Sequence, residues 1–220
     1  MKLAIFDCDG TIIDSQYSII DAMDETFHHY DREPVEAHRT RGMIGLPLEV
    51  AIAGLLEEPL AEHHHEYADT YRQIFRRMRA DGSVSEPLYN GARATIEALD
   101  KSGWLLGIAT GKARRGVDAV LGPIGLSERF VTIQTADVAR GKPDPDMVHR
   151  ALSETGVEPS DAVMIGDTTF DMQMAKNAGV AAVGVNWGYH PSESLLDAGA
   201  HVVIDDWSLL EDAMHGSLGR

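Results

Sequence analysis

Two aspartates near the N-terminus have the side chains and the spacing for chemistry at one site. Asp7 and Asp9 directly follow an apolar run at residues 3–6, which is typical of a buried strand. Alternate side chains of an extended chain point to the same side, so both carboxylates can face one site while Cys8 points into the core. Gly10 allows a sharp turn directly after them. Because close carboxylates repel each other, the pair predicts either a bound hard cation or acid–base chemistry.

Polar and glycine-rich segments recur further along the chain. They are Thr110-Gly111-Lys112, Gly141-Lys142-Pro143-Asp144-Pro145 and Gly166-Asp167-Thr168-Thr169-Phe170-Asp171. In open α/β folds, ligands bind beyond the carboxyl ends of the strands. We therefore expect these segments to meet the two N-terminal aspartates in one crevice.

The groups in this expected crevice suit phosphoryl transfer. Three carboxylates supply oxygen ligands of the kind that Mg²⁺ prefers. They are Asp7, Asp9 and Asp167. Lys142 supplies an ammonium group that can neutralise phosphate oxygens. The Thr110 hydroxyl and the backbone N–H groups near Gly111 are suited to an anion.

The elements that would position these groups form a repeating pattern from residue 87 onward. Strands are expected at residues 105–109, 130–133, 162–165, 181–185 and 201–204, and helices near residues 91–101, 114–121, 145–154 and 171–178, before a short terminal helix. This alternation predicts an α/β fold with helices on both faces of a Rossmann-like parallel sheet, which includes the strand at residues 3–6.

The stretch from residue 15 to residue 83 has helical spacing and no convincing strand. Four positions divide it into roughly four helices. They are Pro34, Gly42, Pro47 and Pro59. The longest helix is expected at residues 60–79, with an apolar stripe that packs against other helices. The sequence thus predicts a core domain formed by residues 1–14 and 84–220, and an all-helical domain formed by residues 15–83.

Composition excludes several classes of function. The 220 residues are 44% hydrophobic and 25% charged, which fits a globular protein with a substantial core. The net charge of −16 argues against general binding to nucleic acid or to anionic membranes. No apolar stretch approaches the ~18 residues of a membrane span. A single cysteine and a charged start without a signal sequence predict a cytoplasmic protein.

The segments DCDGTIID, IATGK, GKPDPD and GDTTFD, in this order, resemble the haloacid-dehalogenase-like (HAD) superfamily phosphatases with a helical cap of the C1 type. The resemblance covers almost the whole chain and implies that residues 15–83 are the cap. It implies that Asp7 attacks phosphorus and becomes an aspartyl phosphate, while Asp9 acts as acid and then as base. It further implies that Mg²⁺ is held by the Asp7 carboxylate, the Asp9 carbonyl and Asp167.

The same resemblance assigns supporting roles. Thr110 and Lys142 would hold the transferring phosphoryl oxygens, and Asp171 would position Lys142 or a metal-bound water. The cap loop at residues 39–47 is loosely similar to that of phosphoglycolate-phosphatase-like members. Two of its residues, Arg41 and Gly45, are therefore expected near the leaving group.

The resemblance implies a Mg²⁺-dependent phosphatase that acts on a small phosphorylated metabolite, with phosphoglycolate as one candidate. A phosphomutase of the same superfamily, similar to beta-phosphoglucomutase, is the alternative, because the core motifs do not separate the two. A binding module that has lost catalysis is disfavoured by the complete set of motifs. The oligomeric state stays open.

Two other groups of residues are expected to be structural. Three consecutive histidines at residues 63–65 are predicted to lie on an exposed helix face, because neighbouring helical residues point about 100° apart and three of them cannot close on one ion. Arg76, Arg77 and Arg79 are expected to form a solvated face. Tyr71 and Phe75 belong to the apolar stripe of the longest helix.

Overall fold

The computed structural model describes residues 1–218, in which six parallel strands form one sheet of order β3-β2-β1-β4-β5-β6. The strands are β1 (Leu3–Phe6), β2 (Leu105–Thr110), β3 (Thr132–Thr135), β4 (Ala162–Gly166), β5 (Ala181–Val185) and β6 (Val202–Ile204). The central strand β1 pairs on both sides, Leu3 with Leu105 and with Ala162. The predicted α/β fold with a parallel sheet is confirmed.

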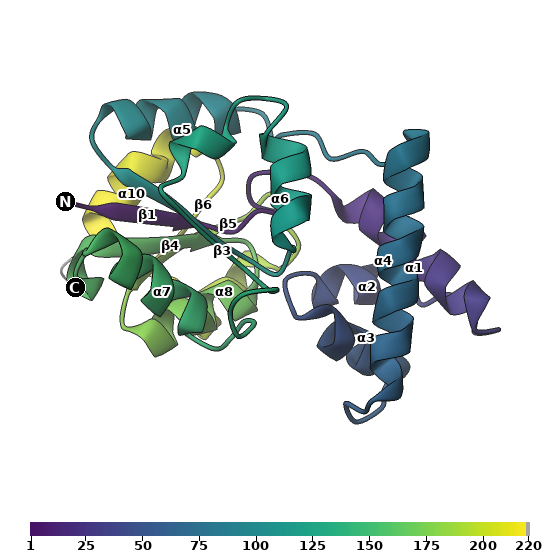
Figure 1. The fold of residues 1–220 in the computed structure, drawn as a ribbon. Helices are drawn as coiled ribbons and strands as arrows, with labels where there is room; N and C mark the ends of the chain where they lie inside the picture. Colours follow the sequence, from purple (N-terminus) through teal and green to yellow (C-terminus); the bar gives the residue numbers. More distant parts are fainter. Residues whose placement is uncertain (219–220) are drawn as a thin grey trace.

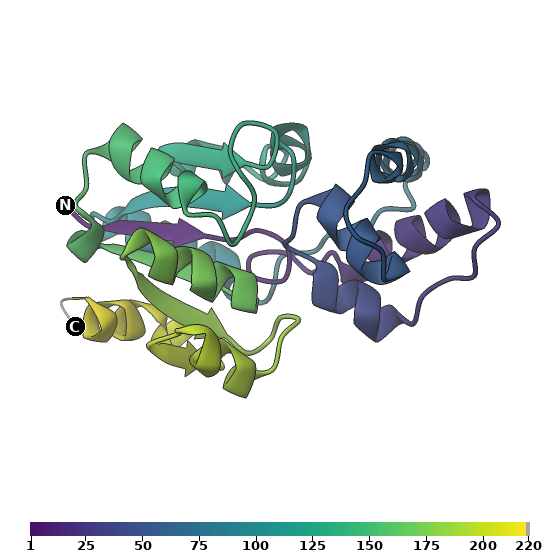
Figure 2. The ribbon, with the colours of Figure 1, turned by 90° about the horizontal axis from the view of Figure 1, so that it is seen from below.

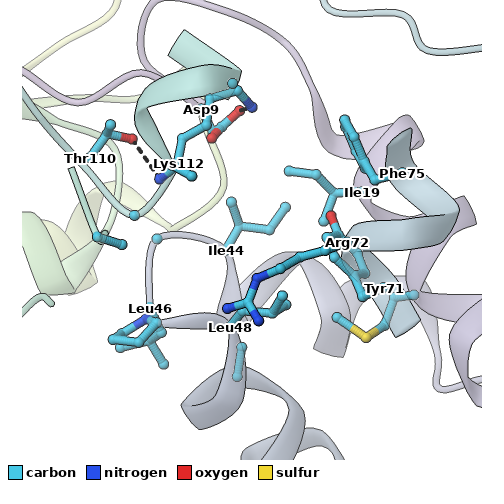
Figure 3. A pocket seen from close by; sticks show the side chains of 18 of the residues that line it. Asp9, Ile19, Ile44, Leu46, Leu48, Tyr71, Arg72, Phe75, Thr110 and Lys112 are labelled. Atoms are coloured by element: carbon cyan, nitrogen blue, oxygen red, sulfur yellow. Dashed lines mark hydrogen bonds and ion pairs between the residues drawn. The ribbon is translucent and has the colours of Figure 1, made fainter. Parts of the chain in front are cut away.

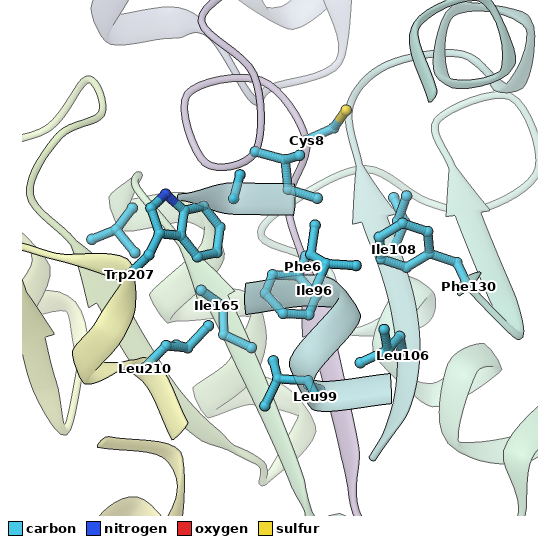
Figure 4. Packing of buried hydrophobic residues seen from close by; sticks show 14 of the residues in the cluster. Phe6, Cys8, Ile96, Leu99, Leu106, Ile108, Phe130, Ile165, Trp207 and Leu210 are labelled. Carbon is cyan, nitrogen blue, oxygen red and sulfur yellow. The ribbon is translucent and has the colours of Figure 1, made fainter. Parts of the chain in front are cut away.

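Helices cover both faces of the sheet (Figure 1). They are α5 (Ala92–Lys101), α6 (Arg114–Leu121), α7 (Asp146–Thr155), α8 (Thr169–Ala178), α9 (Ser192–Ala198) and α10 (Leu210–Ser217). The alternation along β1 explains the two layers. Phe6 and Cys8 pack with α5 and α10, as Figure 4 shows, whereas Leu3 and Ile5 pack with α7 and α8. Cys8, two residues beyond the end of β1, is fully buried, as the alternation of side chains predicts.

The strand β3 begins two residues later than expected. A 3₁₀ turn, η1 (Ser127–Arg129), occupies the approach to the strand. The Phe130 ring packs edge-on against Phe6 at a centroid distance of 6.3 Å. The apolar character of residue 130 therefore serves core packing rather than strand pairing, and the paired residues of β3 are the more polar ones that follow.

Four helices lie between β1 and α5, a stretch that the structure describes throughout. They are α1 (Gln16–His29), α2 (Ala37–Met43), α3 (Leu48–Leu56) and α4 (His63–Asp81). We call them the helical insertion. It lies at the carboxyl ends of the strands (Figures 1 and 2). Among the described residues, no helix has the length and apolarity that a membrane crossing requires.

The helical insertion has an apolar cluster of its own. Phe27 of α1 is fully buried and packs with Ile52 and Leu55 of α3 and with Tyr67 of α4. The sheet has separate clusters on its two faces, and we call the one that contains Ile96 of α5 the sheet cluster. Separate clusters in the helical insertion and at the sheet allow the two regions to unfold at different denaturant concentrations. The division at residues 15 and 83 stays a prediction.

Phe27→Ala tests whether the helical insertion unfolds on its own. We expect the truncation to lower its free energy of unfolding by about 3–5 kcal/mol, because a cavity replaces the ring. Urea unfolding is followed by far-UV circular dichroism and by tryptophan fluorescence. All three tryptophans lie in or against the sheet cluster, so fluorescence reports on the sheet. The dichroism should decrease before the fluorescence changes.

The matched control is Ile96→Ala, which truncates a buried side chain of the sheet cluster by a similar volume. It should shift both signals together, because the sheet cluster supports the site-bearing strands. If Phe27→Ala also shifts both signals together, the helical insertion and the sheet form one cooperative unit.

Candidate active site

Asp7 and Asp9 stand at the carboxyl end of β1, next to β4. The Asp7 N–H donates to the Ile165 carbonyl of β4 at 2.9 Å, and both aspartates are buried. The chain then turns at Gly10, whose φ is +84°. A Cβ at this glycine would lie 2.2 Å from Asp167 Oδ2, so the turn can pass this close to Asp167 only without a side chain.

Lys142 forms the central ion pairs of the site. Its Nζ lies 2.8 Å from Asp7 Oδ1 and 2.6 Å from Asp171 Oδ1. The three residues are at most 2% exposed. Burial alone would lower the pKa of Lys142, but the Asp171 and Asp7 carboxylates outweigh it and raise this pKa. The lysine therefore stays charged between the two carboxylates.

Asp171 is held in place by the start of α8. Thr168 caps this helix and donates to Asp171 Oδ2 from its backbone N–H at 3.0 Å and from its hydroxyl at 2.7 Å. The Thr168 hydroxyl in turn accepts from the Asp171 N–H, which completes a capping box. One carboxylate oxygen thus orients the helix, and the other is left for Lys142.

Asp167 completes an acidic group with Asp7 and Asp171. Oxygens of the three carboxylates lie within 4.8 Å of one another. Asp167 accepts from the Thr11 hydroxyl at 2.8 Å and from the Tyr189 N–H at 2.9 Å. Burial, together with the Asp7 and Asp171 charges, raises its pKa well above the usual range. Burial also raises the pKa of Asp7 to about 7, against the opposing effect of Lys142.

This acidic group fits a divalent cation such as Mg²⁺. Asp7 Oδ2 is buried and has no hydrogen-bond partner among residues 1–218. Three carboxylates face a single lysine, and burial, to which the neighbouring carboxylates add, raises the pKa values of Asp7 and Asp167. Oxygen ligands with excess negative charge are the donor set that Mg²⁺ prefers.

Asp9 belongs to a second set of contacts. Its Oδ1 accepts from the Ser15 hydroxyl at 2.6 Å and from Lys112 Nζ at 2.8 Å. Lys112 also pairs with Glu86 Oε1 at 2.9 Å (Figure 3 shows Lys112 beside Asp9). Sequence reasoning gave no role to Lys112 or Glu86, although Lys112 stands two residues after Thr110. The Asp9 side chain thus lies apart from the three-carboxylate group.

Thr110 and Gly111 end β2 beside the helical insertion. The Thr110 hydroxyl accepts from the Lys112 N–H at 3.2 Å. A Cβ at Gly111 would lie 2.8 Å from the Gly45 carbonyl. Similarly, a Cβ at Gly141 would lie 2.2 Å from the Pro47 ring. The loop between α2 and α3 therefore contacts the sheet edge at two positions where the absence of a side chain permits it.

The two candidate residues, Arg41 and Gly45, occupy different places. The segment at residues 39–47 was expected to be a loop, but Arg41 lies in α2 and only Gly45 lies in the connection between α2 and α3. Gly45 lines the cavity of the site and adopts a φ of +102°. Arg41 instead donates from Nε to Gln16 Oε1 at 2.7 Å and is not among the cavity-lining residues. Nearby, His190 Nε2 lies 3.1 Å from the carbonyl of Gly42 in α2, so this helix contacts the connection between β5 and α9.

A cavity of about 840 Å³ lies between the sheet edge and the helical insertion. Asp7, Asp9 and Thr110 line it on one side, whereas Lys142 and Asp167 lie next to Asp7 and are not among the lining residues. Apolar side chains and three arginines of α4 line the other side, and Figure 3 shows Arg72 among them. They include Ile44, Leu46, Tyr71, Phe75, Arg72, Arg76 and Arg79.

Several of these residues do more than the sequence-based expectation assigns to them. Tyr71 and Phe75 pack against the buried clusters of the helical insertion, as predicted, and they also line the cavity, where the Phe75 ring lies 5.9 Å from Lys112 Nζ. Their helical spacing alone does not distinguish a cavity wall from a packed stripe. Arg76 and Arg79 also line the cavity, and Arg79 pairs with Glu86 at 2.5 Å. Arg77 does lie on the solvated face, paired with Glu25.

Comparison with known proteins places this site in a family. A probable phosphatase, IndB, from Dickeya dadantii (strain 3937) is 34% identical over 98% of this chain and 94% of its own length. A phosphoglycolate phosphatase from Rhodospirillum rubrum is 30% identical over 96% of this chain and 90% of its own length. The crystal structure of a hydrolase from Pseudomonas syringae matches with a TM-score of 0.85 and 27% identity, over the full length of both chains.

A model of the haloacid dehalogenase-like hydrolases matches residues 4–185, which include all four segments that carry the resemblance. The fold, the order of the segments and the relatives agree. The chain belongs to the haloacid dehalogenase-like hydrolase family.

Proposed function

We propose that this protein is a Mg²⁺-dependent phosphatase that hydrolyses a small phosphate monoester. The observation that carries this proposal is the Asp7 carboxylate, which lines the cavity, pairs with Lys142 through one oxygen and keeps the other free of hydrogen bonds within residues 1–218. A phosphorylated metabolite is the partner, and the cytoplasm is the proposed location.

Asp7 is the nucleophile. Its free oxygen forms a bond to phosphorus as the bond from phosphorus to the leaving oxygen breaks, which produces an aspartyl phosphate. Lys142 keeps Asp7 oriented and, with Thr110, holds the phosphoryl oxygens. Water then attacks phosphorus, and the Asp7 carboxylate and inorganic phosphate are released.

Asp9 handles the protons of both steps. It donates a proton to the leaving oxygen and then accepts one from the attacking water. Its protonation state at the end of the cycle is therefore the same as at the start. Ser15 and Lys112 hold Oδ1, which orients the carboxyl group toward the cavity that Asp9 lines.

The proposed ligands of Mg²⁺ are the Asp7 carboxylate, the Asp9 carbonyl and Asp167. When bound, the ion neutralises negative charge between nucleophile and phosphate, whose repulsion is about 4 kcal/mol per charge pair at ~4 Å and an effective dielectric of about 20. Asp171 is proposed to act indirectly, by holding Lys142.

Residues 15–83 are proposed to act as a cap that excludes water and contacts the leaving group. The loop containing Gly45 supports this role, because it lies on Gly111 at the edge of the cavity. Tyr71 and Phe75 supply an apolar wall to the same cavity. A leaving group larger and less polar than glycolate therefore suits the site.

Asp7→Asn tests the nucleophile. We expect release of inorganic phosphate from an aryl phosphate to decrease by at least about 10³-fold, since the amide cannot form the covalent intermediate. Asp21→Asn, which changes an exposed aspartate of α1, is the matched control and should keep the parent rate. Turnover by Asp7→Asn at the parent rate would refute the mechanism.

Asp9→Asn separates proton transfer from metal binding. Turnover should decrease by about 10²–10⁴-fold, because general acid–base catalysis is lost. Mg²⁺ affinity, measured by calorimetry, should change little if the backbone carbonyl of this residue is the ligand. A parallel loss of Mg²⁺ affinity and turnover contradicts that assignment.

The charge of the acidic group predicts that the stability of the folded protein depends on pH when a chelator removes divalent cations. The pKa of Asp7 is higher in the folded protein than its ordinary value of 3.8, so its protonated form stabilises the fold and this contribution is lost as the pH rises toward 7. Asp7→Asn mimics the protonated group. Its melting temperature should exceed that of the parent at about pH 8 and match it near pH 4, and Mg²⁺ should remove the difference at the higher pH. Equal melting temperatures of the two proteins at both pH values would show that ionised Asp7 does not destabilise the folded protein.

The size of the cavity predicts the order of substrates. We expect kcat/KM for monoesters with an apolar leaving group to exceed that for phosphoglycolate by at least about tenfold, the usual effect of one added apolar contact. The assay measures free phosphate and isomerised sugar phosphate together. A preference for phosphoglycolate contradicts the proposed leaving group but not the phosphatase, whereas isomerised product without free phosphate would establish a phosphomutase.

A further inference from the structure

A second group of potential metal ligands lies outside the active site, where α3 connects to α4. Glu58 Oε2 lies 2.9 Å from His63 Nε2 and 3.4 Å from His64 Nε2. One ligand atom from each of the three side chains lies within 4.8 Å of the other two. This connection is at the end of the helical insertion far from the sheet, at the bottom of Figure 1.

The backbone brings Glu58 back toward the start of α4. Glu57 ends α3 in the left-handed conformation, with a φ of +59°. The N–H of Glu58 then donates to the Ala53 carbonyl at 3.0 Å. The sequence did not predict this group, because Glu58 lies outside α4 and the helical spacing of α4 does not show that the chain folds back toward its start.

His64 is the unexpected member. It was predicted to be exposed, but it is fully buried. The prediction was wrong because this residue packs beneath the connection that precedes α4, where its Nδ1 contacts Ala61. The prediction that residues 63–65 do not share one ion agrees with the geometry. His65 faces Glu49 instead, at 3.6 Å, and is exposed.

The Nε2 atom of His64 has no hydrogen-bond partner in the described part of the chain. Its Nδ1 meets both polar groups of Ala61, the N–H at 3.0 Å and the carbonyl at 3.1 Å, so Nδ1 has a partner in either tautomer. With the proton on Nδ1, the lone pair of Nε2 faces Glu58. With the proton on Nε2, the 3.4 Å contact to Glu58 lacks hydrogen-bond alignment. A cation between the two groups satisfies both.

We propose that Glu58, His63 and His64 form a binding site for a divalent transition-metal ion, with Zn²⁺ as its best-suited occupant. Two imidazole nitrogens and one carboxylate oxygen form a donor set that suits Zn²⁺ and disfavours Mg²⁺. A backbone carbonyl at Nδ1, here from Ala61, is the usual support of a metal-binding histidine. Arg32 lies 3.5 Å from Glu58 Oε1, which leaves Oε2 for the metal.

The position of the site suggests a structural role. A metal there would tie the end of α3 to the start of α4, next to the apolar cluster that contains Leu55 and Tyr67. His63 is half-exposed, so one side remains open to water and to an entering ion. The bound metal would therefore stabilise the helical insertion without touching the reacting groups.

The experiment measures Zn²⁺ binding and the Zn²⁺-dependent melting temperature of metal-stripped full-length protein, in excess Mg²⁺ to occupy the acidic group. Co²⁺ absorption in the visible range reports the ligand set. We expect one Zn²⁺ per chain and a higher melting temperature, since an ion that binds the folded state stabilises it. His63→Gln and Glu58→Gln, which change partly exposed side chains, should each weaken binding by at least about tenfold.

His65→Gln is the matched control, because it removes a neighbouring histidine that lies outside the site. It should keep the parent affinity, the Co²⁺ spectrum and the shift in melting temperature. His64→Gln should abolish binding, and the two other variants carry the test if this buried change impairs folding. Absence of Zn²⁺ binding by the parent, or equal affinity in all variants, overturns the proposal. Loss of Zn²⁺ binding in Asp167→Asn alone would assign the ion to the acidic group and also overturn it.

Discussion

Lys142 is buried between two carboxylates, and the arrangement of the active site depends on this contact. Asp7 and Asp171 lie within 2.8 Å and 2.6 Å of its Nζ, with Asp167 close by. A buried lysine without partners would be strongly destabilising, and so would the carboxylates without the lysine. The strands β1 and β4 are neighbours in the sheet. The pairing of β1 with β4 thus brings the carboxylates together, and Lys142 offsets part of their charge.

The charge balance is nevertheless incomplete, since one lysine faces three carboxylates. Burial is the largest cause that raises the pKa values of Asp7 and Asp167, and neighbouring carboxylates add to it. If Asp7 is the nucleophile, as proposed, a cation and a bond to phosphorus would each withdraw charge from this destabilised carboxylate. The Asp9 side chain lies apart from these three carboxylates, where Ser15 and Lys112 hold it.

Much of this arrangement could be predicted from the sequence, because it depends on local patterns. The alternation of strands and helices gave the sheet, and the helix at residues 114–121 has the predicted limits. The position of Lys112 between Asp9 and Glu86 was not predictable, because Glu86 approaches from the chain that returns from α4. The burial of His64 has the same cause, since it depends on how a connection folds back. Contacts between distant segments leave no periodic signal in the chain.

The contacts between the helical insertion and the sheet argue for a division of roles. Gly111 and Gly141 allow Gly45 and Pro47 to lie directly on the sheet edge, because these two positions carry no side chain. The opposite wall, formed by Tyr71 and Phe75, belongs to α4, and both side chains also pack against the apolar clusters of the helical insertion. Changes on α4 can alter the shape of the cavity without moving the phosphoryl-transfer groups. If the helical insertion selects the leaving group, the residues that determine this selection therefore lie mainly on α4. A metal at the start of α4 would stabilise the helix that carries them.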